Sequence, residues 1–330
     1  MKKLMNAVEA MLDESLDGFA AAHSDIVELG PERKFVRRRT ATRGKVALIS
    51  GGGSGHEPLH AGFVGLGMLD AACPGQVFTS PTPDQMVAAI EAVDAGAGVL
   101  LIVKNYEGDV MNFEMAAELA AASDRKVETV VTNDDAAVPN STWSTGRRGV
   151  AGTLVVEKIV GAAAEQLMGI EDLRDLGRQV NERTRSFGVA LAPCTAPAAG
   201  KPTFTLADDE MEVGVGIHGE PGRRRSKLGS ADAIAEEMLS AILDDLAPPA
   251  GSRCLLLVNG FGGTPLMELY LMVDAARRIL MGRGIAVSRY LTGSLVTSLD
   301  MAGCSITITL LDDRLTGLWD APVRTASLSW

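Results

Sequence analysis

Residues 45–58 read KVALISGGGSGHEP, and this stretch decides the class of fold that the chain can adopt. Its first half, Lys45 to Ser50, is an apolar run of the kind that forms a strand buried on both faces, as in a parallel sheet. Four of the next five residues are glycine, which predicts a turn at the end of that strand. Backbone N–H groups in such a turn can bind an oxyanion or a hydroxyl oxygen.

Strand-like apolar runs alternate with helical patterns along the rest of the chain. Strands are expected at 98–103, 126–131, 185–191, 212–217, 254–258 and 305–311, and helices at 84–95, 111–122, 150–168, 171–185, 230–246 and 266–281. This alternation predicts an α/β protein of two α/β domains, residues 1–182 and 183–330, each a largely parallel sheet flanked by helices. The succession of strand, glycine-rich turn and helix is expected twice, at 45–65 and at 254–281.

The composition is that of an ordinary globular protein, and it argues against several classes of partner. The 330 residues carry 42 acidic and 31 basic side chains, a net charge of −11, which disfavours nucleic acid or an anionic membrane as the main partner. The apolar runs are too short to span a bilayer. The four cysteines are scattered and form no Cys-x-x-Cys pair. We therefore expect a cytoplasmic protein with no metal site.

The glycine-rich stretch is not one of the common nucleotide-binding loops. A Walker A loop requires Gly-Lys-Ser/Thr, and here His56 and Glu57 follow the glycines. A dinucleotide-binding loop requires a third glycine where His56 stands. His56 and His60 are four residues apart, but they lie at a glycine turn and not on one helix face, which argues against a metal site. We interpret His56 as a functional imidazole and His60 as structural.

A second group of polar residues follows the strand expected at 98–103. Lys104 and Asp109 stand in the segment KNYEGDVMNF, residues 104–113. Ligands of open α/β sheets lie outside the carboxyl ends of the strands. There, Asp109 could take a proton from a substrate hydroxyl and Lys104 could stabilise charge. The alternatives are a helix N-cap for Asp109 and a solvated strand end for Lys104.

His218 stands in the run VGVGIHGEPG, residues 213–222, among residues with almost no side chain. The glycines let a ligand approach closely, and neutral imidazole is a good nucleophile toward a carbonyl carbon. Addition to a ketone would give a hemiaminal, which selects carbonyl compounds over polyols. The residues alone leave open both this role and that of a metal ligand, although no His-x-x-His or His-x-x-x-His pairing accompanies His218.

Four segments together resemble one known family, the substrate-binding K subunits of dihydroxyacetone kinases. They are residues 51–58, 104–113, 193–209 and 214–222. The resemblance runs from the first helix to the C-terminus, and it implies a homodimer of two-domain α/β protomers. It implies that His218 binds dihydroxyacetone as a hemiaminal and that His56 and Asp109 form the base-type pair, so these three are the predicted catalytic residues. The predicted substrate-binding residues are Gly53, Ser54, Gly55, His56, Lys104, Asp109 and His218.

The same resemblance places the nucleotide on a different protein. We expect no cofactor in this chain, whose length leaves no room for a fused nucleotide domain, and ADP or ATP with Mg²⁺ on a partner L subunit. The expected function is phosphoryl transfer to the terminal hydroxyl of dihydroxyacetone held on His218. Two phosphoryl donors stay open: ATP, and phosphoenolpyruvate acting through a phosphotransferase-system M subunit.

Two alternative functions also stay open. The acceptor could be a four-carbon ketose such as erythrulose, because the sequence does not size the pocket. The chain could instead be a ketone-sensing transcriptional co-activator without catalysis, since paralogues of the family keep the histidine. The presence of His56 and Asp109 beside His218 favours catalysis.

Overall fold

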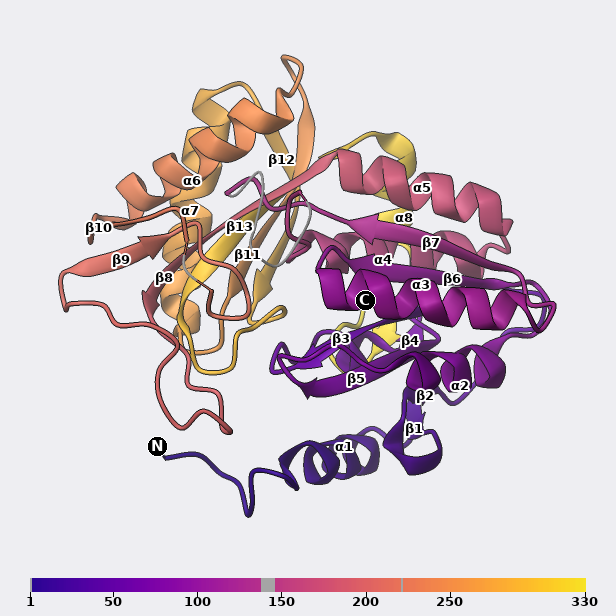
Figure 1. The fold of residues 1–330 in the computed structure, drawn as a ribbon. Coiled ribbons are helices and arrows are strands. Elements are labelled where there is room, and N and C mark those ends of the chain that lie inside the picture. Colours follow the sequence, from indigo (N-terminus) through magenta and orange to yellow (C-terminus); the bar gives the residue numbers. More distant parts are fainter. Residues whose placement is uncertain (1, 138–145, 221) are drawn as a thin grey trace.

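Two six-stranded sheets with flanking helices dominate the computed structural model, which describes residues 2–137, 146–220 and 222–330 (Figure 1). A two-stranded ribbon accompanies them. The expected α/β class, with two sheets flanked by helices, is confirmed. Within the described ranges, every helix is too short or too polar to cross a membrane.

The first sheet has a parallel core and an antiparallel edge. Its strands, in spatial order, are β1 (Val27–Leu29), β2 (Val36–Arg38), β5 (Ala71–Val77), β3 (Ala47–Ser54), β6 (Val99–Lys104) and β7 (Val127–Thr132). The last four of these are parallel to one another, whereas β1 and β2 pair antiparallel. The expectation of a largely parallel sheet is confirmed in this half of the chain.

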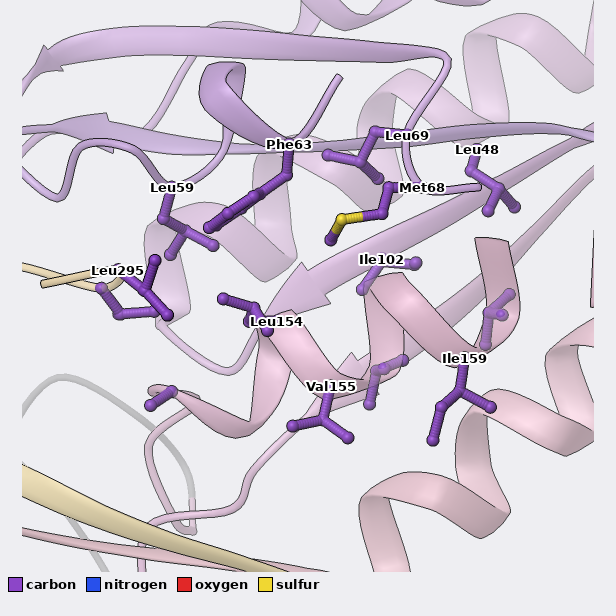
Figure 2. Packing of buried hydrophobic residues seen from close by; sticks show 14 of the residues in the cluster. Leu48, Leu59, Phe63, Met68, Leu69, Ile102, Leu154, Val155, Ile159 and Leu295 are labelled. Carbon is purple, nitrogen blue, oxygen red and sulfur yellow. The ribbon is translucent and has the colours of Figure 1, made fainter. Parts of the chain in front are cut away.

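Helices cover both faces of the first sheet. α2 (Pro83–Val93) and α3 (Glu107–Ala121) pack on one face, and α4 (Gly152–Glu165) and α5 (Ile170–Glu182) pack on the other. Figure 2 shows apolar side chains of α4 facing those of the strands in the larger of these cores. Full burial of one such side chain stabilises the fold by about 1.5–3 kcal/mol. A further helix, α1 (Met11–Ala22), precedes the sheet, and the 3₁₀ turn η1 (Pro31–Arg33) joins β1 to β2.

The second sheet is mostly antiparallel, so the expectation of a largely parallel sheet is wrong there. Its strands, in spatial order, are β10 (Arg224–Lys227), β9 (Glu210–Val213), β8 (Thr184–Ala192), β13 (Ala302–Leu311), β11 (Arg253–Gly260) and β12 (Ala286–Gly293). Only β11 and β12 are parallel neighbours among these strands. α6 (Ala231–Leu246) and α7 (Leu266–Gly282) cover the outer face (Figure 1).

The expectation of a largely parallel second sheet is wrong for a topological reason. A helix between two strands makes them parallel neighbours only if the chain crosses over and returns beside the strand that it left. α7 does this between β11 and β12. α6 joins β10 to β11, which lie apart in the sheet, and β13 enters between β8 and β11 in the antiparallel direction. Alternation along the sequence carries no information about that spatial order.

The last residues of the chain return to the first sheet. After β13, α8 (Asp313–Asp320) contacts α4, and β14 (Arg324–Thr325) pairs with β4 (Gly65–Leu66). Figure 1 shows the C-terminus beside the strands of the first half. The division of the chain at 182/183 falls between α5 and β8 and stays a prediction. Residues 313–330 contact both halves: α8 packs against α4 and also against β13, and Asp313 and Asp320 pair with Arg253 and Arg289.

The glycines of the opening stretch lie within a strand and do not form the expected turn. Gly51, Gly52 and Gly53 belong to β3 and pair with β5. A Cβ on Gly51 would lie 2.6 Å from the carbonyl oxygen of Cys73, so the missing side chain permits close approach of a neighbour. The expected α-helix after this stretch is also wrong: only a 3₁₀ turn, η2 (Ala61–Phe63), follows.

Candidate functional site

Three segments that are distant in sequence bring their rings together around His218. The His56 ring follows β3, and the Tyr106 ring precedes α3. Their centroids lie 4.6 Å and 4.5 Å from the centroid of His218, both edge-on. Phe78, just after β5, is 5.5 Å from His218 and stacks on His56 at 5.2 Å. The structure thus joins the two glycine-flanked histidines that the sequence analysis singled out.

His56 is fully buried and has a fixed tautomer. Its Nδ1 lies 2.8 Å from the backbone carbonyl oxygen of Thr297. Because a carbonyl oxygen only accepts, Nδ1 carries the proton and Nε2 has a free lone pair. Nε2 has no hydrogen-bond partner among the described residues. Burial, followed by the nearby His218 and Lys104, holds the pKa of His56 well below its usual range, so the ring is a neutral acceptor.

His218 is also neutral near physiological pH. Burial lowers its pKa to about 3, and the charges of Lys104 and Arg148 act in the same direction. The relative exposure of its whole residue is intermediate, whereas the ring is enclosed by its neighbours. A neutral imidazole keeps the lone pair that nucleophilic addition to a carbonyl requires. The environment of His218 therefore suits the role predicted from its sequence.

Lys104 and Asp109 form a buried ion pair beside these rings. Lys104 ends β6 and is fully buried, and Asp109 lies in the first turn of α3 with 2% exposure. Lys104 Nζ lies 3.5 Å from Asp109 Oδ2, while Asp109 Oδ1 has no partner among the described residues. Both alternatives for these residues are wrong: Lys104 is not solvated, and Tyr106, not Asp109, occupies the N-cap position of α3.

The loop that carries His218 is held by a buried arginine from the first half of the chain. Arg148 is 1% exposed; it contacts Asp135 at 2.6 Å and Glu220 at 3.3 Å, and it donates to the Gly214 carbonyl oxygen at 2.8 Å. Glu220 Oε2 in turn accepts the backbone N–H of His218 at 2.8 Å. This network fixes the turn, of which Pro221 lies outside the described residues.

Two of the predicted oxygen-binding groups already form hydrogen bonds within the protein. The hydroxyl of Ser54 donates to the Gly75 carbonyl oxygen at 2.7 Å. The N–H of Gly55 donates to the carboxylate of Glu57 at 3.0 Å. Gly53 is a paired residue of β3, where a Cβ would lie 2.6 Å from the Thr79 nitrogen. A role for these three residues in binding substrate stays a prediction.

Sequence reasoning missed several residues of this site. Tyr106 stands in the segment 104–113, but no local pattern indicates that its ring faces His218 or that its buried hydroxyl has no partner among the described residues. Glu220 likewise stands in the run 213–222 beside His218. Arg148, Phe78 and Thr297 carry no local sequence signal, because their roles depend on contacts across the fold. Whether a tyrosine hydroxyl lacks a partner and lies near a candidate nucleophile depends on the tertiary structure, so the sequence could not show it.

The arrangement can bind and activate a small carbonyl compound that also has hydroxyl groups. His218 offers a neutral nucleophile for the carbonyl carbon. His56 Nε2 and Asp109 Oδ1 are free acceptors for hydroxyl protons, and the Tyr106 hydroxyl is a free donor. No group of three or more histidine, cysteine, aspartate or glutamate side chains in the described ranges has a geometry suited to a metal ion.

Comparisons with known proteins agree with this geometry. The model of the Dak1 domain family matches residues 17–327. The chain is 51% identical over 314 residues, 95% of each chain, to the dihydroxyacetone-binding subunit DhaK of a PTS-dependent dihydroxyacetone kinase from Listeria innocua. It is 48% identical to the DhaK subunit of the PEP-dependent dihydroxyacetone kinase of Escherichia coli, with coverage of 100% and 99%.

Solved structures share the fold of this chain. The fold matches the dihydroxyacetone kinase operon co-activator Dha-DhaQ with a TM-score of 0.90 and 36% identity, covering 95% of this chain and 97% of that one. It matches the dihydroxyacetone kinase of C. freundii with a TM-score of 0.90 and 34% identity, covering 99% of this chain and 60% of that one. Matched over almost its whole length by the family model, by its relatives and by solved structures, this chain belongs to the Dak1 family.

Proposed function

We propose that this chain is the ketose-binding subunit of a dihydroxyacetone kinase, which captures dihydroxyacetone on His218 and holds its terminal hydroxyl for phosphorylation. One observation carries the proposal: the rings of His56 and Tyr106, each with an unpartnered buried polar atom, lie against a neutral His218. Asp109, near enough to Tyr106 to act on its pKa, has a third unpartnered atom, Oδ1. Each buried polar atom without a partner costs about 1–3 kcal/mol. A polar ligand that satisfies them therefore binds with a corresponding gain.

The chemistry begins with addition to the ketone. The free imidazole nitrogen of His218 forms a bond to the carbonyl carbon, the carbonyl π bond breaks, and the N–H proton of the other ring nitrogen is transferred to the carbonyl oxygen, so that the adduct is neutral. The hemiaminal holds the sugar in one orientation. Asp109, beside Lys104, then accepts the proton of the terminal hydroxyl as that oxygen bonds to the incoming phosphorus and the bond from phosphorus to its leaving oxygen breaks.

The phosphoryl donor belongs to a partner in this proposal. A nucleotide-binding L subunit carrying ADP or ATP with Mg²⁺ supplies the phosphoryl group. The full-length relatives at 51% and 48% identity are named as PTS- and PEP-dependent, which favours phosphoenolpyruvate as the ultimate donor through an M subunit. The names of the longer triokinase relatives, of which this chain spans 58%, carry no such term. Assembly as a homodimer and a cytoplasmic location, which four free, buried cysteines suit, complete the proposal.

The test separates capture of the ketone from transfer. We expect Asp109→Asn to bind [2-¹³C]dihydroxyacetone as a hemiaminal, seen as the loss of the carbonyl ¹³C signal, and to lose about 10²–10⁴-fold in transfer with an L subunit. His218→Ala should lose the hemiaminal signal altogether. Normal turnover by Asp109→Asn would reject its role as the base, and a hemiaminal signal in His218→Ala would reject covalent capture on this residue.

Glycerol and erythrulose provide the matched ligand controls. Glycerol has no carbonyl carbon and should leave His218 unmodified in a crystal soak. Continuous density to erythrulose, with transfer at a rate comparable to that of dihydroxyacetone, would favour the four-carbon alternative. Transfer restricted to dihydroxyacetone would exclude it.

A second candidate function rests on the similarity to the operon co-activator Dha-DhaQ, at 36% identity. In that case the chain would bind the ketone and then a transcription factor. Its higher identity to the kinase subunits, 51% and 48%, and the unpartnered acceptors of His56 and Asp109 favour catalysis. A tight complex with a transcription factor, together with no transfer by any L subunit, would reverse this assignment.

A further inference from the structure

A buried series of polar side chains connects helix α4, on one face of the first sheet, with Asp109 of α3, on the other face. Glu157 of α4 contacts His60, just before η2, with 2.6 Å between Glu157 Oε1 and His60 Nδ1. His60 Nε2 lies 3.1 Å from Lys104 Nζ, and Lys104 Nζ lies 3.5 Å from Asp109 Oδ2. None of the four is more than 5% exposed. His60, interpreted from the sequence as structural, is thus connected to the proposed base, Asp109, through a single side chain, that of Lys104.

The donors and acceptors of this series allow a single arrangement. The ammonium group of Lys104 has three N–H donors and no acceptor. It faces three groups: the Gly51 carbonyl oxygen at 3.4 Å, His60 Nε2 and the carboxylate of Asp109. His60 Nε2 must therefore accept, and its proton resides on Nδ1, which donates to Glu157 Oε1. The proton that the raised pKa keeps on the Glu157 carboxyl group then lies on the other oxygen, Oε2, so Oε1 remains an acceptor. Burial and the charge of Lys104 hold the pKa of His60 well below its usual range, so the ring is neutral, as this arrangement needs.

Glu157 decides which nitrogen of His60 faces the lysine. Without an acceptor at Nδ1, the His60 proton can move to Nε2, where an N–H group would point at the ammonium group. That contact is repulsive in a buried site, where charges are poorly screened. Lys104 would then shift away from this contact, and Asp109 would lose its ionic partner. There is little other room for the ammonium group, since a Cβ on Gly52 would lie 2.2 Å from Nζ.

We propose that Glu157 and His60 are positioning residues for the phosphoryl transfer: Glu157 fixes the Nδ1–H tautomer of His60, His60 holds the Lys104 ammonium group, and Lys104 holds Asp109 toward the substrate hydroxyl. The inference rests on the proposed function in one respect, the role of Asp109 as the base. Neither Glu157 nor His60 needs to contact the substrate. The precedent is the carboxylate that orients a functional histidine in many enzyme sites, whose loss costs on the order of 10- to 100-fold in activity.

The test compares two substitutions of Glu157 in the full-length protein with an L subunit. Glu157→Leu has a similar size and no acceptor, and we expect it to form the hemiaminal normally while its transfer rate falls on the order of 10- to 100-fold. Glu157→Gln keeps an amide oxygen that can accept from Nδ1, and it should restore much of that rate. Glu165→Leu is the matched control on the same helix, because Glu165 bonds to Arg38 and Gly67 instead, and it should transfer at the normal rate.

Nitrogen NMR of the histidine rings gives a readout that is independent of activity. ¹⁵N shifts should show Nδ1–H for His60 in the unaltered protein and in Glu157→Gln, and a population of Nε2–H in Glu157→Leu. His60→Asn provides a second route if Glu157→Leu fails to fold, because it also removes the acceptor that faces Lys104. It should likewise keep capture of the ketone and lose transfer.

The outcomes separate this inference from the proposed function. An Nε2–H tautomer in the unaltered protein, or normal transfer by both Glu157→Leu and His60→Asn while Asp109→Asn is inactive, would overturn the positioning role alone. Normal transfer by Asp109→Asn would reject Asp109 as the base, and the positioning role of Glu157, His60 and Lys104 would then have no group to act on. Loss of both hemiaminal formation and transfer in Glu157→Leu would show a general structural role and would also reject the inference.

Discussion

At the scale of single residues, the site is defined by what burial does to ionisation. His218 and His56 are neutral because charging either ring inside the protein is unfavourable, and neighbouring Lys104 adds to that effect. Neutral imidazoles can act as a nucleophile and as an acceptor at neutral pH, whereas exposed histidines are partly protonated there. The fold thus prepares the two rings for carbonyl chemistry before any ligand arrives.

The low pKa of His218 predicts capture of the ketone over a wide pH range. With a pKa of about 3, His218 stays neutral down to pH of about 5, whereas an unperturbed histidine, with a pKa of about 6.5, would be mostly protonated there. Hemiaminal occupancy at fixed dihydroxyacetone concentration should therefore be constant between about pH 8 and pH 5, measured by ¹³C NMR. A tenfold or larger loss at the acid end, with the fold intact, would contradict the predicted ionisation.

We expect Glu157 to make stability depend on pH in the opposite direction from a salt-bridged carboxylate, which stabilises a protein more as the pH rises. Burial raises its pKa to about 8, above the unfolded value near 4.5. Between these values the folded state keeps a proton that the unfolded state releases. The free energy of unfolding should therefore fall as pH rises through this window, by up to about 1.4 kcal/mol per pH unit from this group. Urea unfolding at several pH values should show a shallower dependence for Glu157→Gln; an identical dependence would contradict the shifted pKa.

At the scale of elements, helix α4 is the central packing element, because nearly all of it is buried between the first sheet and the second unit. Several of its residues are small, which lets the neighbouring backbone approach.

Ser230 shows which helix signals the local sequence contains. The sequence predicts that it begins the helix at 230–246, and its hydroxyl accepts the Ala233 N–H at the start of α6. Helix caps of this kind are local, so the sequence can predict them.

Two helical glycines predict opposite effects of an added methyl group. A Cβ on Gly161 of α4 would lie 2.4 Å from the Gly67 carbonyl oxygen, so Gly161→Ala should destabilise the protein by about 1–3 kcal/mol. Gly317 of α8 has no atom within 4 Å of that position. Gly317→Ala should stabilise by roughly 0.5–1 kcal/mol through helix propensity. Urea midpoints of the two variants measure the difference, and equal shifts would contradict the close packing of α4.

At the scale of the whole molecule, the two sheets share one core. The largest cluster of buried apolar residues includes α4 and strands of the first sheet, together with inward-facing residues of β11 and the C-terminal segment. The His218 site depends on this arrangement, since Arg148 of the first half of the chain holds the loop that follows β9. The relative placement of the two sheets therefore sets the distance between His218 and the residues that would act on its adduct.

The C-terminal segment predicts a stability effect far from the site. Leu328 is 8% exposed and packs in the shared core, so Leu328→Ala should cost about 2–5 kcal/mol. Leu119 on α3 is 52% exposed, and Leu119→Ala should change the free energy of unfolding by less than about 0.5 kcal/mol. Chemical unfolding of both variants provides the comparison. Equal stabilities would mean that residues 313–330 do not contribute to the core.

The sequence by itself determined the α/β class and most helix and strand positions, and it nominated His56, Asp109 and His218 as candidate site residues, because periodicity, capping and residue chemistry are local properties. It also carried the family resemblance. Only the tertiary structure decided that the second sheet is mostly antiparallel and that the glycines of residues 51–53 lie in a strand, since strand order and close packing depend on distant neighbours.

The same distinction holds within the site. The sequence offered candidates for the groups able to react, but the orientation of the histidine rings comes from distant partners, such as Thr297, 241 residues from His56, and Glu157, 97 residues from His60. Tyr106 and Arg148 became visible as parts of the site only when their contacts were known. Local sequence specifies which chemistry is available, whereas burial and long-range hydrogen bonds determine the protonation states in which it operates.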